Sequence, residues 1–208
     1  MAVIRILGID PGTQVVGYGC LQLTAEAPSG GVPLAMRTAN ALRAASDGGV
    51  SLLDCGVLRL GRDRLADRLL ALADRLRELF ARLQPAELAL EEAFYGKSVS
   101  AALRIGEARG VVLAEAARAG VAIHQYAPAR VKRCVTGSGA AGKTTVAAMV
   151  LRQLGAVDGF SKAPADATDA LAVAFTRVEE RRSPLLQRDQ LEAALGEGHR
   201  LRRGRRRR

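Results

Sequence analysis

Apolar residues occur along this chain in two arrangements, as short continuous runs and as longer stretches that repeat every three to four positions. The first run, residues 4–9, is apolar except for Arg5 and ends at Asp10-Pro11-Gly12. So short and apolar a run predicts a strand buried on both faces of a sheet, and the Pro-Gly pair predicts the turn that ends it. We expect further strands at residues 15–23, 51–60, 87–93 and 121–126.

Leucines spaced alternately four and three residues apart predict an amphipathic helix. They are Leu65, Leu69, Leu72, Leu76, Leu79 and Leu83, and Gln84-Pro85 follows as the signal that ends the helix. Other helices are expected at residues 98–119, 128–132, 144–154 and 166–178, with a glycine-rich loop at 137–143. Strands at the start of the chain, with helices between the later strands, predict an α/β domain with a mixed sheet flanked by helices.

Two small residues in the helix expected at 98–119, Gly106 and Gly110, lie four positions apart. This spacing is typical of close packing within one chain, and it also occurs at contacts between helices of two chains. The sequence leaves both interpretations open.

Two segments depart from the patterned part of the chain, which we expect to form one domain over residues 1–180. Residues 24–50 are rich in Ala, Gly, Pro and Ser without a sustained period, which predicts a loop insertion. Residues 181–208 form a basic tail with seven arginines among the last nine positions. Such a tail is expected to be disordered without a partner, and a solvated tail with no specific role is the alternative.

The chain carries 31 Lys and Arg against 21 Asp and Glu, a formal net charge of +10. This excess favours a polyanionic partner, and nucleic acid is favoured over a membrane surface because no amphipathic basic helix and no bilayer-spanning apolar run is evident. No signal peptide is visible, which predicts a cytoplasmic protein. The scattered Cys20, Cys55 and Cys134 predict reduced thiols rather than a zinc site or a disulfide framework.

Four carboxylates are placed where a shared site would need them. Asp10 and Glu91 each follow a buried strand, where Asp10 by itself could simply cap its turn. Asp166 and Asp169 are three apart and so share one helix face. The helix dipole accounts for an acid at Asp166, but Asp169 adjoins an apolar run, where a carboxylate is costly without a cation.

Clustered carboxylates repel one another unless a divalent cation lies between them. Mg²⁺ prefers oxygen ligands and keeps waters that can attack a phosphate, and two such ions about 4 Å apart can clamp a phosphodiester. Together with the basic composition, the four acids predict a metal-dependent nuclease.

Residues 7–13, 89–94 and 165–172 resemble the three acidic motifs of the RuvC Holliday-junction resolvases, in the family's order and spacing. The resemblance covers nearly all of residues 1–178 and implies a ribonuclease H-like fold and a homodimer. It further implies Mg²⁺-dependent paired nicks in four-way junction DNA, which leave 5′-phosphate and 3′-hydroxyl ends, in recombination and repair. A branch-migration motor complex is the implied protein partner.

The matched motifs imply a role for particular residues. The catalytic metal ligands would be Asp10, Glu91, Asp166 and Asp169, which would hold two Mg²⁺ ions that Mn²⁺ can replace. Glu91 is preferred to Glu92 because it follows Ala89-Leu90 in the register of the family motif. The implied DNA-binding residues are Phe94, Lys132 and Lys143, although a core position explains Phe94 equally well.

Three other functions compete with the nuclease. Residues 137–144 match the P-loop pattern of nucleotide triphosphatases, but residues 130–135 are too charged for the buried strand that must precede a P-loop, so we interpret the match as chance. An actin-like or sugar-kinase ATPase needs a second phosphate loop, which the chain lacks. A non-catalytic nucleic-acid-binding module would give Asp166 and Asp169 no function. The two histidines, His124 and His199, have no partner at metal-ligand spacing, so they predict no metal site.

Overall fold

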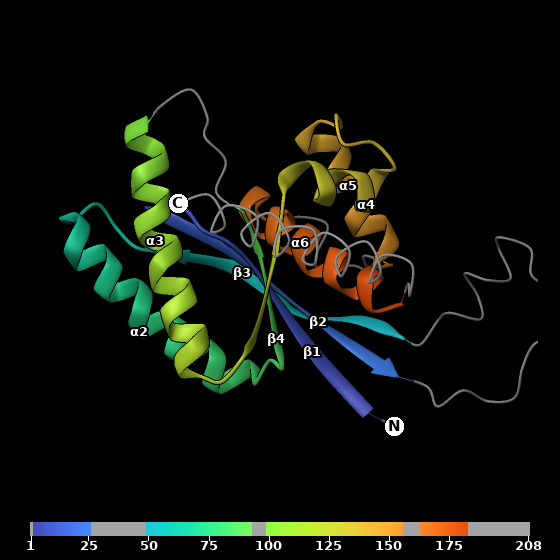
Figure 1. Cartoon of the computed structure of the whole chain (residues 1–208), viewed down its shortest axis with the longest axis horizontal. Helices are drawn as coiled ribbons and strands as arrows, with labels where there is room; N and C mark the ends of the chain where they lie inside the picture. The colour runs from blue at the N-terminus through green and yellow to red at the C-terminus, as the bar shows by residue number, and fades with distance from the viewer. Residues whose placement is uncertain (1, 26–48, 93–98, 156–162, 183–208) are drawn as a thin grey trace, which may run out of the picture.

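The computed structural model describes residues 2–25, 49–92, 99–155 and 163–182 of the chain. Within them, five strands form one sheet in the order β3-β2-β1-β4-β5 (Figure 1). The strands are β1 (Ala2–Asp10), β2 (Val15–Ala25), β3 (Val50–Arg59), β4 (Glu87–Glu91) and β5 (Ala122–Tyr126). Strand β2 is antiparallel to both β1 and β3, whereas β4 is parallel to β1 and to β5, so the predicted mixed sheet is confirmed.

The helices lie in two layers, one on each face of the sheet (Figure 1). One face carries α2 (Leu65–Leu83) and α3 (Val99–Arg118), and the other carries α4 (Pro128–Thr136), α5 (Lys143–Gln153) and α6 (Ala165–Arg182). None of the described helices is long and apolar enough to cross a bilayer. The insertion expected at 24–50 and the tail expected at 181–208 lie largely outside the described residues.

Strand β1 is the centre of the core. The side chains of Ile6, Leu7 and Ile9 are fully buried, as the apolar run predicted. Leu7 and Ile9 pack toward α2 and α3, and Ile6 packs toward α6, because successive side chains of a strand point to opposite faces.

The leucine pattern of α2 is also confirmed. Its inner face buries Leu72, Leu76, Leu79 and Leu83 against the sheet. The helix ends where Gln84 takes a positive φ of 47° and its N–H donates to the Phe80 carbonyl at 2.9 Å. Pro85 follows directly and prevents the helix from continuing.

Helix α6 lies directly on the sheet because β1 and β2 carry glycines beneath it. A Cβ atom on Gly8 would be 2.0 Å from the Ala170 carbonyl oxygen, and one on Gly17 would be 1.9 Å from the Asp166 carbonyl oxygen. Only residues without a side chain permit this approach. The two glycines therefore fix where the first turns of α6 meet the sheet.

A buried ionic cluster fastens the other end of α6 to β4, β5 and α4. Glu87 accepts from Arg177 at 2.8 Å and from Arg181 at 2.9 Å, and the fully buried Glu180 pairs with Arg130 at 2.7 Å and Arg177 at 2.9 Å. The Tyr126 hydroxyl also donates to Glu180 at 2.5 Å. These contacts explain why α6 runs to residue 182, beyond the expected end at residue 178.

Candidate active site

Two of the predicted acids meet at the carboxyl edge of the sheet. Strands β1 and β4 are parallel neighbours in which Ile9 pairs with Leu90, so the next residues, Asp10 and Glu91, lie side by side. The carboxyl ends of parallel strands are where α/β proteins commonly bind their ligands.

The other two acids come from the start of α6. The Asp166 carbonyl rests on Gly17, which is the β2 partner of Asp10, so the sheet contact brings the first turn of α6 over the end of β1. Asp166 and Asp169 are both partly buried there. The structure therefore brings together all four acids that the sequence motifs indicated.

The acids influence one another strongly. Burial and then repulsion from Asp169 and Glu91 raise the pKa of Asp10 to about 7, with a smaller contribution from Asp166, while Lys143 acts in the opposite direction. Burial and repulsion from Asp169 also raise the pKa of Glu91. Burial and mutual repulsion of these carboxylates thus both favour their neutral forms.

The two predicted lysines lie beside these acids. Lys143, the first residue of α5, donates from Nζ to Asp169 Oδ2 at 2.7 Å. This hydrogen bond, more than the surrounding charges, raises the pKa of Lys143. Lys132, on α4, is close enough to Glu91 for its positive charge to oppose part of the rise in the pKa of that carboxyl. Phe94 lies outside the described residues.

The donor set suits a hard divalent cation. All four acids offer oxygen ligands, and the pKa of Asp10 is raised first by burial and then by the neighbouring carboxylates. As the described side chains stand, however, no three acids, histidines or cysteines converge closely enough to hold a metal ion. Instead, the ammonium group of Lys143 neutralises Asp169.

Comparison with known proteins identifies the family. The profile of the family described as crossover junction endodeoxyribonuclease RuvC matches residues 31–177. This chain belongs to the RuvC family. The RuvC proteins of Roseiflexus sp. and Halorhodospira halophila are 38% and 39% identical to it over 84% and 87% of its length, and 90% and 93% of theirs.

Solved structures agree with this assignment. The chain is similar to Thermus thermophilus RuvC, with a TM-score of 0.68 and 28% identity over 86% of this chain and 96% of that one. The same protein in complex with a Holliday junction substrate gives a TM-score of 0.65 at 26% identity, over 86% and 95% of the two chains. The yeast mitochondrial Holliday junction resolvase Ydc2, 14% identical over 83% and 78% with a TM-score of 0.53, shares the fold. The expected ribonuclease H-like fold is thereby confirmed.

The fold of this RuvC-family protein also rules out a P-loop at residues 137–144. A P-loop joins a strand to a helix, whereas here helix α4 precedes the loop and ends at Gly137, which has a φ of 81°. The glycine-rich segment is the connection between α4 and α5. The interpretation of this motif as a chance match is therefore supported.

Arg109 is a site residue that the sequence did not indicate. Its guanidinium, on α3, donates to the main-chain carbonyl of Glu91 and to the side-chain oxygen of Gln125 on β5. It also helps to line a shallow cavity of about 170 Å³ that contains Asp10 and Glu91. The sequence offered one signal for Arg109, its position next to Ala108. That signal could not be used, because the sequence did not show which side of the helix faces the sheet.

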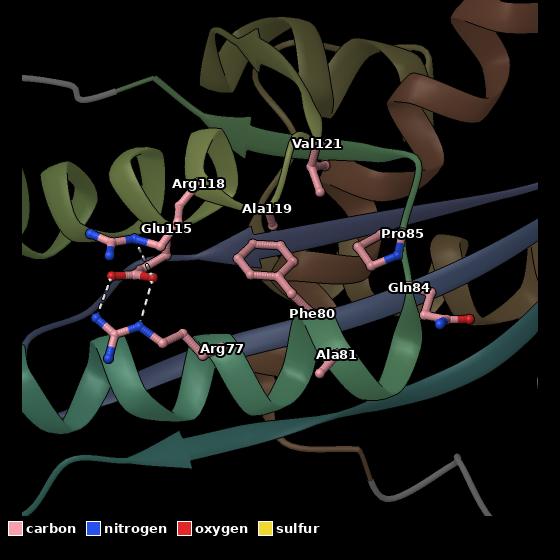
Figure 2. Close-up of a pocket in the computed structure, with 9 residues that line it drawn as sticks. All are labelled: Arg77, Phe80, Ala81, Gln84, Pro85, Glu115, Arg118, Ala119 and Val121. Carbon is pink, nitrogen blue, oxygen red and sulfur yellow. Dashed lines mark hydrogen bonds and ion pairs between the residues drawn. The ribbon is translucent and has the colours of Figure 1, made fainter.

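A larger hollow, of about 460 Å³, lies near the opposite ends of β4 and β5, between α2 and α3 (Figure 2). Arg77 on α2 and Glu115 on α3 form a bidentate salt bridge at one side of the hollow, and Phe80 forms part of its wall. None of the four acids lines this hollow, so the candidate site is the one at the carboxyl edge of the sheet.

Proposed function

We propose that this RuvC-family protein resolves four-way DNA junctions by paired strand nicks that depend on a divalent metal. The observation that carries the proposal is the position of Asp10 beside Glu91, under the first turn of α6 that bears Asp166 and Asp169. Solved relatives include a RuvC protein in complex with a Holliday junction substrate.

In this proposal the four acids hold two Mg²⁺ ions, which Mn²⁺ can replace. When bound, such ions supply an activated water and stabilise the oxygen that leaves the phosphorus. Asp10 and Glu91 present oxygens from the rigid sheet, and Asp166 and Asp169 present theirs from α6. Attack that expels the 3′ oxygen of the strand leaves a 5′-phosphate and a 3′-hydroxyl.

Lys143 and Lys132 act on the phosphate in this proposal. The Lys143 side chain is 81% exposed although its ammonium group is bound to Asp169, so it can reach a DNA strand laid over the acids. An ammonium group held there stabilises negative charge that develops during phosphoryl transfer. Lys132, on α4, adds positive charge next to Glu91.

Two nicks in one junction require two sites, and the outer face of α3 is suited to a homodimer contact. Val99 and Leu103 are 70% and 64% exposed. Gly106 and Gly110 continue the same stripe, are exposed, and have no atom within 4 Å of a built Cβ, so they serve no close packing among the described residues. A second copy could approach this stripe closely.

By the same family relationship, the protein would act in the cytoplasm, in recombination and repair, and alongside a branch-migration motor.

The test is nicking of an end-labelled four-way junction with Mg²⁺, compared with EDTA and with a linear duplex of the same sequence. We expect symmetric nicks that DNA ligase reseals, and loss of more than about 100-fold in rate for Asp10→Asn. Asp74→Asn, which removes an exposed acid on α2, is the matched control and should nick normally. Cleavage by Asp10→Asn at the rate of the control would refute the proposed site.

A further inference from the structure

Three exposed arginines adjoin the proposed site on the side of β3. They are Arg59 at the end of β3 and Arg62 and Arg64 in the connection to α2, here called the arginine loop. None of them belongs to the acidic motifs or to the lysines considered above. Their surroundings indicate a further contact for DNA.

Sheet topology places the arginine loop at the same edge as the four acids. Strand β3 runs in the direction of β1, because each is antiparallel to β2. The turn after Asp10 is joined to this segment by two hydrogen bonds. The Leu60 N–H donates to the Gln14 carbonyl at 2.9 Å, and Arg68 Nη1 donates to the Thr13 carbonyl at 2.5 Å.

Side-chain alternation directs Arg59 to the face that carries α6. Leu58 and Leu60, on either side of it, pack into the core beneath α2 and α3, so Arg59 points the other way. Its partner on β2 is Val15, two residues from the glycine on which the first turn of α6 rests. From strand spacing and rise, the Cα atom of Arg59 is roughly 8 Å from that of Gly17.

The charge balance of this segment leaves positive charge free for a ligand. Arg64 is 88% exposed and pairs at 3.1 Å with Asp67, itself about half exposed, and such surface pairs are weak. Asp63 is the other acid of the connection, and it lies next to Gly61. Arg59 and Arg62 enter no ion pair recorded among the described residues.

We propose that the arginine loop binds backbone phosphates of the junction arm that leaves the active site on the β3 side. Because Arg59 lies near the first turn of α6, its side chain can reach a phosphate close to the scissile bond. Arginine suits this role because its planar fork can hold two phosphate oxygens. The proposal rests on the proposed function for its substrate, but its test is one of binding.

The experiment measures junction affinity without Mg²⁺ over a series of salt concentrations. Each phosphate contact contributes about 0.9 to the slope of log affinity against log salt. For the Arg59→Ala, Arg62→Ala double variant we expect a slope reduced by about 2 and affinity lowered at least tenfold at low salt. Arg59→Lys, Arg62→Lys should keep most of the slope, because ammonium groups also bind phosphate.

Arg75→Ala is the matched control, since Arg75 is an exposed arginine further along α2, away from the edge that carries the site. It should reproduce the wild-type slope. A double alanine variant with the wild-type slope, or a lysine variant that loses as much slope as the alanine variant, would overturn the proposal. Wild-type nicking is measured in parallel, so absence of nicking refutes the proposed function while the salt slopes still decide the arginine loop.

Discussion

The two ends of helix α6 carry charge in opposite ways. At its start, four acids influence one another and Lys143 is the one cation within ion-pair distance of them among the described residues, and the pKa of Asp10 rises to about 7. At its end, Glu87 and Glu180 are matched by arginines. Burial would raise the pKa of Glu87, but hydrogen bonds from Arg181 and Arg177 prevail and lower it to about 2.

The difference separates two tasks that one helix performs. A matched buried cluster holds the helix on the sheet, whereas an unmatched cluster costs stability and attracts a cation. Helix α6 also contacts the sheet closely at Gly8 and Gly17. The ion pairs at its end therefore help to hold the acids at its start in position. Charge removal should therefore have opposite effects on stability at the two ends of α6.

The largest effect on stability is expected for Glu180→Gln. This change removes the carboxylate paired with Arg130 and one of the two paired with Arg177, which keeps Glu87. Removing one partner of a buried pair costs about 3–5 kcal/mol. Urea unfolding followed by circular dichroism measures this loss. Glu179→Gln is the control, because Glu179 pairs with Arg182 in a partly exposed setting, and it should change the free energy of unfolding by less than about 1 kcal/mol. Equal losses for both variants would refute the distinction.

The matched end should also produce an acid-dependent loss of stability. Folding lowers the pKa of Glu87 to about 2, so its contribution is complete above the unfolded value of about 4.3 and is lost as the pH falls from there to about 2. The amount is on the order of 3 kcal/mol. Unfolding free energies at pH 6, 4 and 3 measure it, and Glu87→Gln should remove this component of the pH dependence. A variant that loses stability with acid as steeply as the wild type would contradict this assignment.

The sequence predicted the acidic end of α6 better than the matched end. A buried strand before Asp10 and acids spaced three apart are local patterns, and the family motifs place them in a known order. The sequence Val178-Glu179-Glu180-Arg181-Arg182 looks instead like a solvated helix end running into a tail. Its burial depends on Glu87 and Tyr126, which are far away in the chain, and no local pattern records those partners.

Arg109 was missed for a similar reason. A helix pattern predicts which side faces the sheet only when apolar residues mark it, and α3 has small or apolar residues on its exposed side as well. The partners of the guanidinium are a main-chain carbonyl and a glutamine, neither of which gives a charge pattern that can be recognised in a sequence.

A smaller effect, on catalysis rather than on folding, is expected for Arg109→Ala. Its guanidinium joins α3 to the end of β4, so its loss frees the strand end that carries Glu91. Loss of a group that orients a metal ligand costs about 10-fold or more. We expect the single-turnover nicking rate to fall by that factor with junction affinity unchanged, and added guanidinium to restore part of it.

The control for this positioning role is Arg118→Ala, on the same helix, which removes an exposed arginine 3.5 Å from Glu115 while Glu115 keeps its pair with Arg77. It should nick at the wild-type rate. If Arg109→Ala lowered junction affinity as much as the nicking rate, or if guanidinium restored nothing, Arg109 would not position Glu91.

The smallest effect has the opposite sign. Asp10→Asn removes one charge from the unmatched cluster, so without metal and at pH 8, where Asp10 is ionised, the variant should be more stable than the wild type by about 1 kcal/mol. Thermal unfolding in EDTA measures the gain, and Asp74→Asn, which loses an exposed pair, should show none. Added Mg²⁺ should raise the wild-type melting temperature and leave that of Asp10→Asn nearly unchanged, because a ligand stabilises only the form that binds it. A lower melting temperature for Asp10→Asn in EDTA would mean that the acids at the start of α6 are already neutralised within the chain, and the contrast between its two ends would fail.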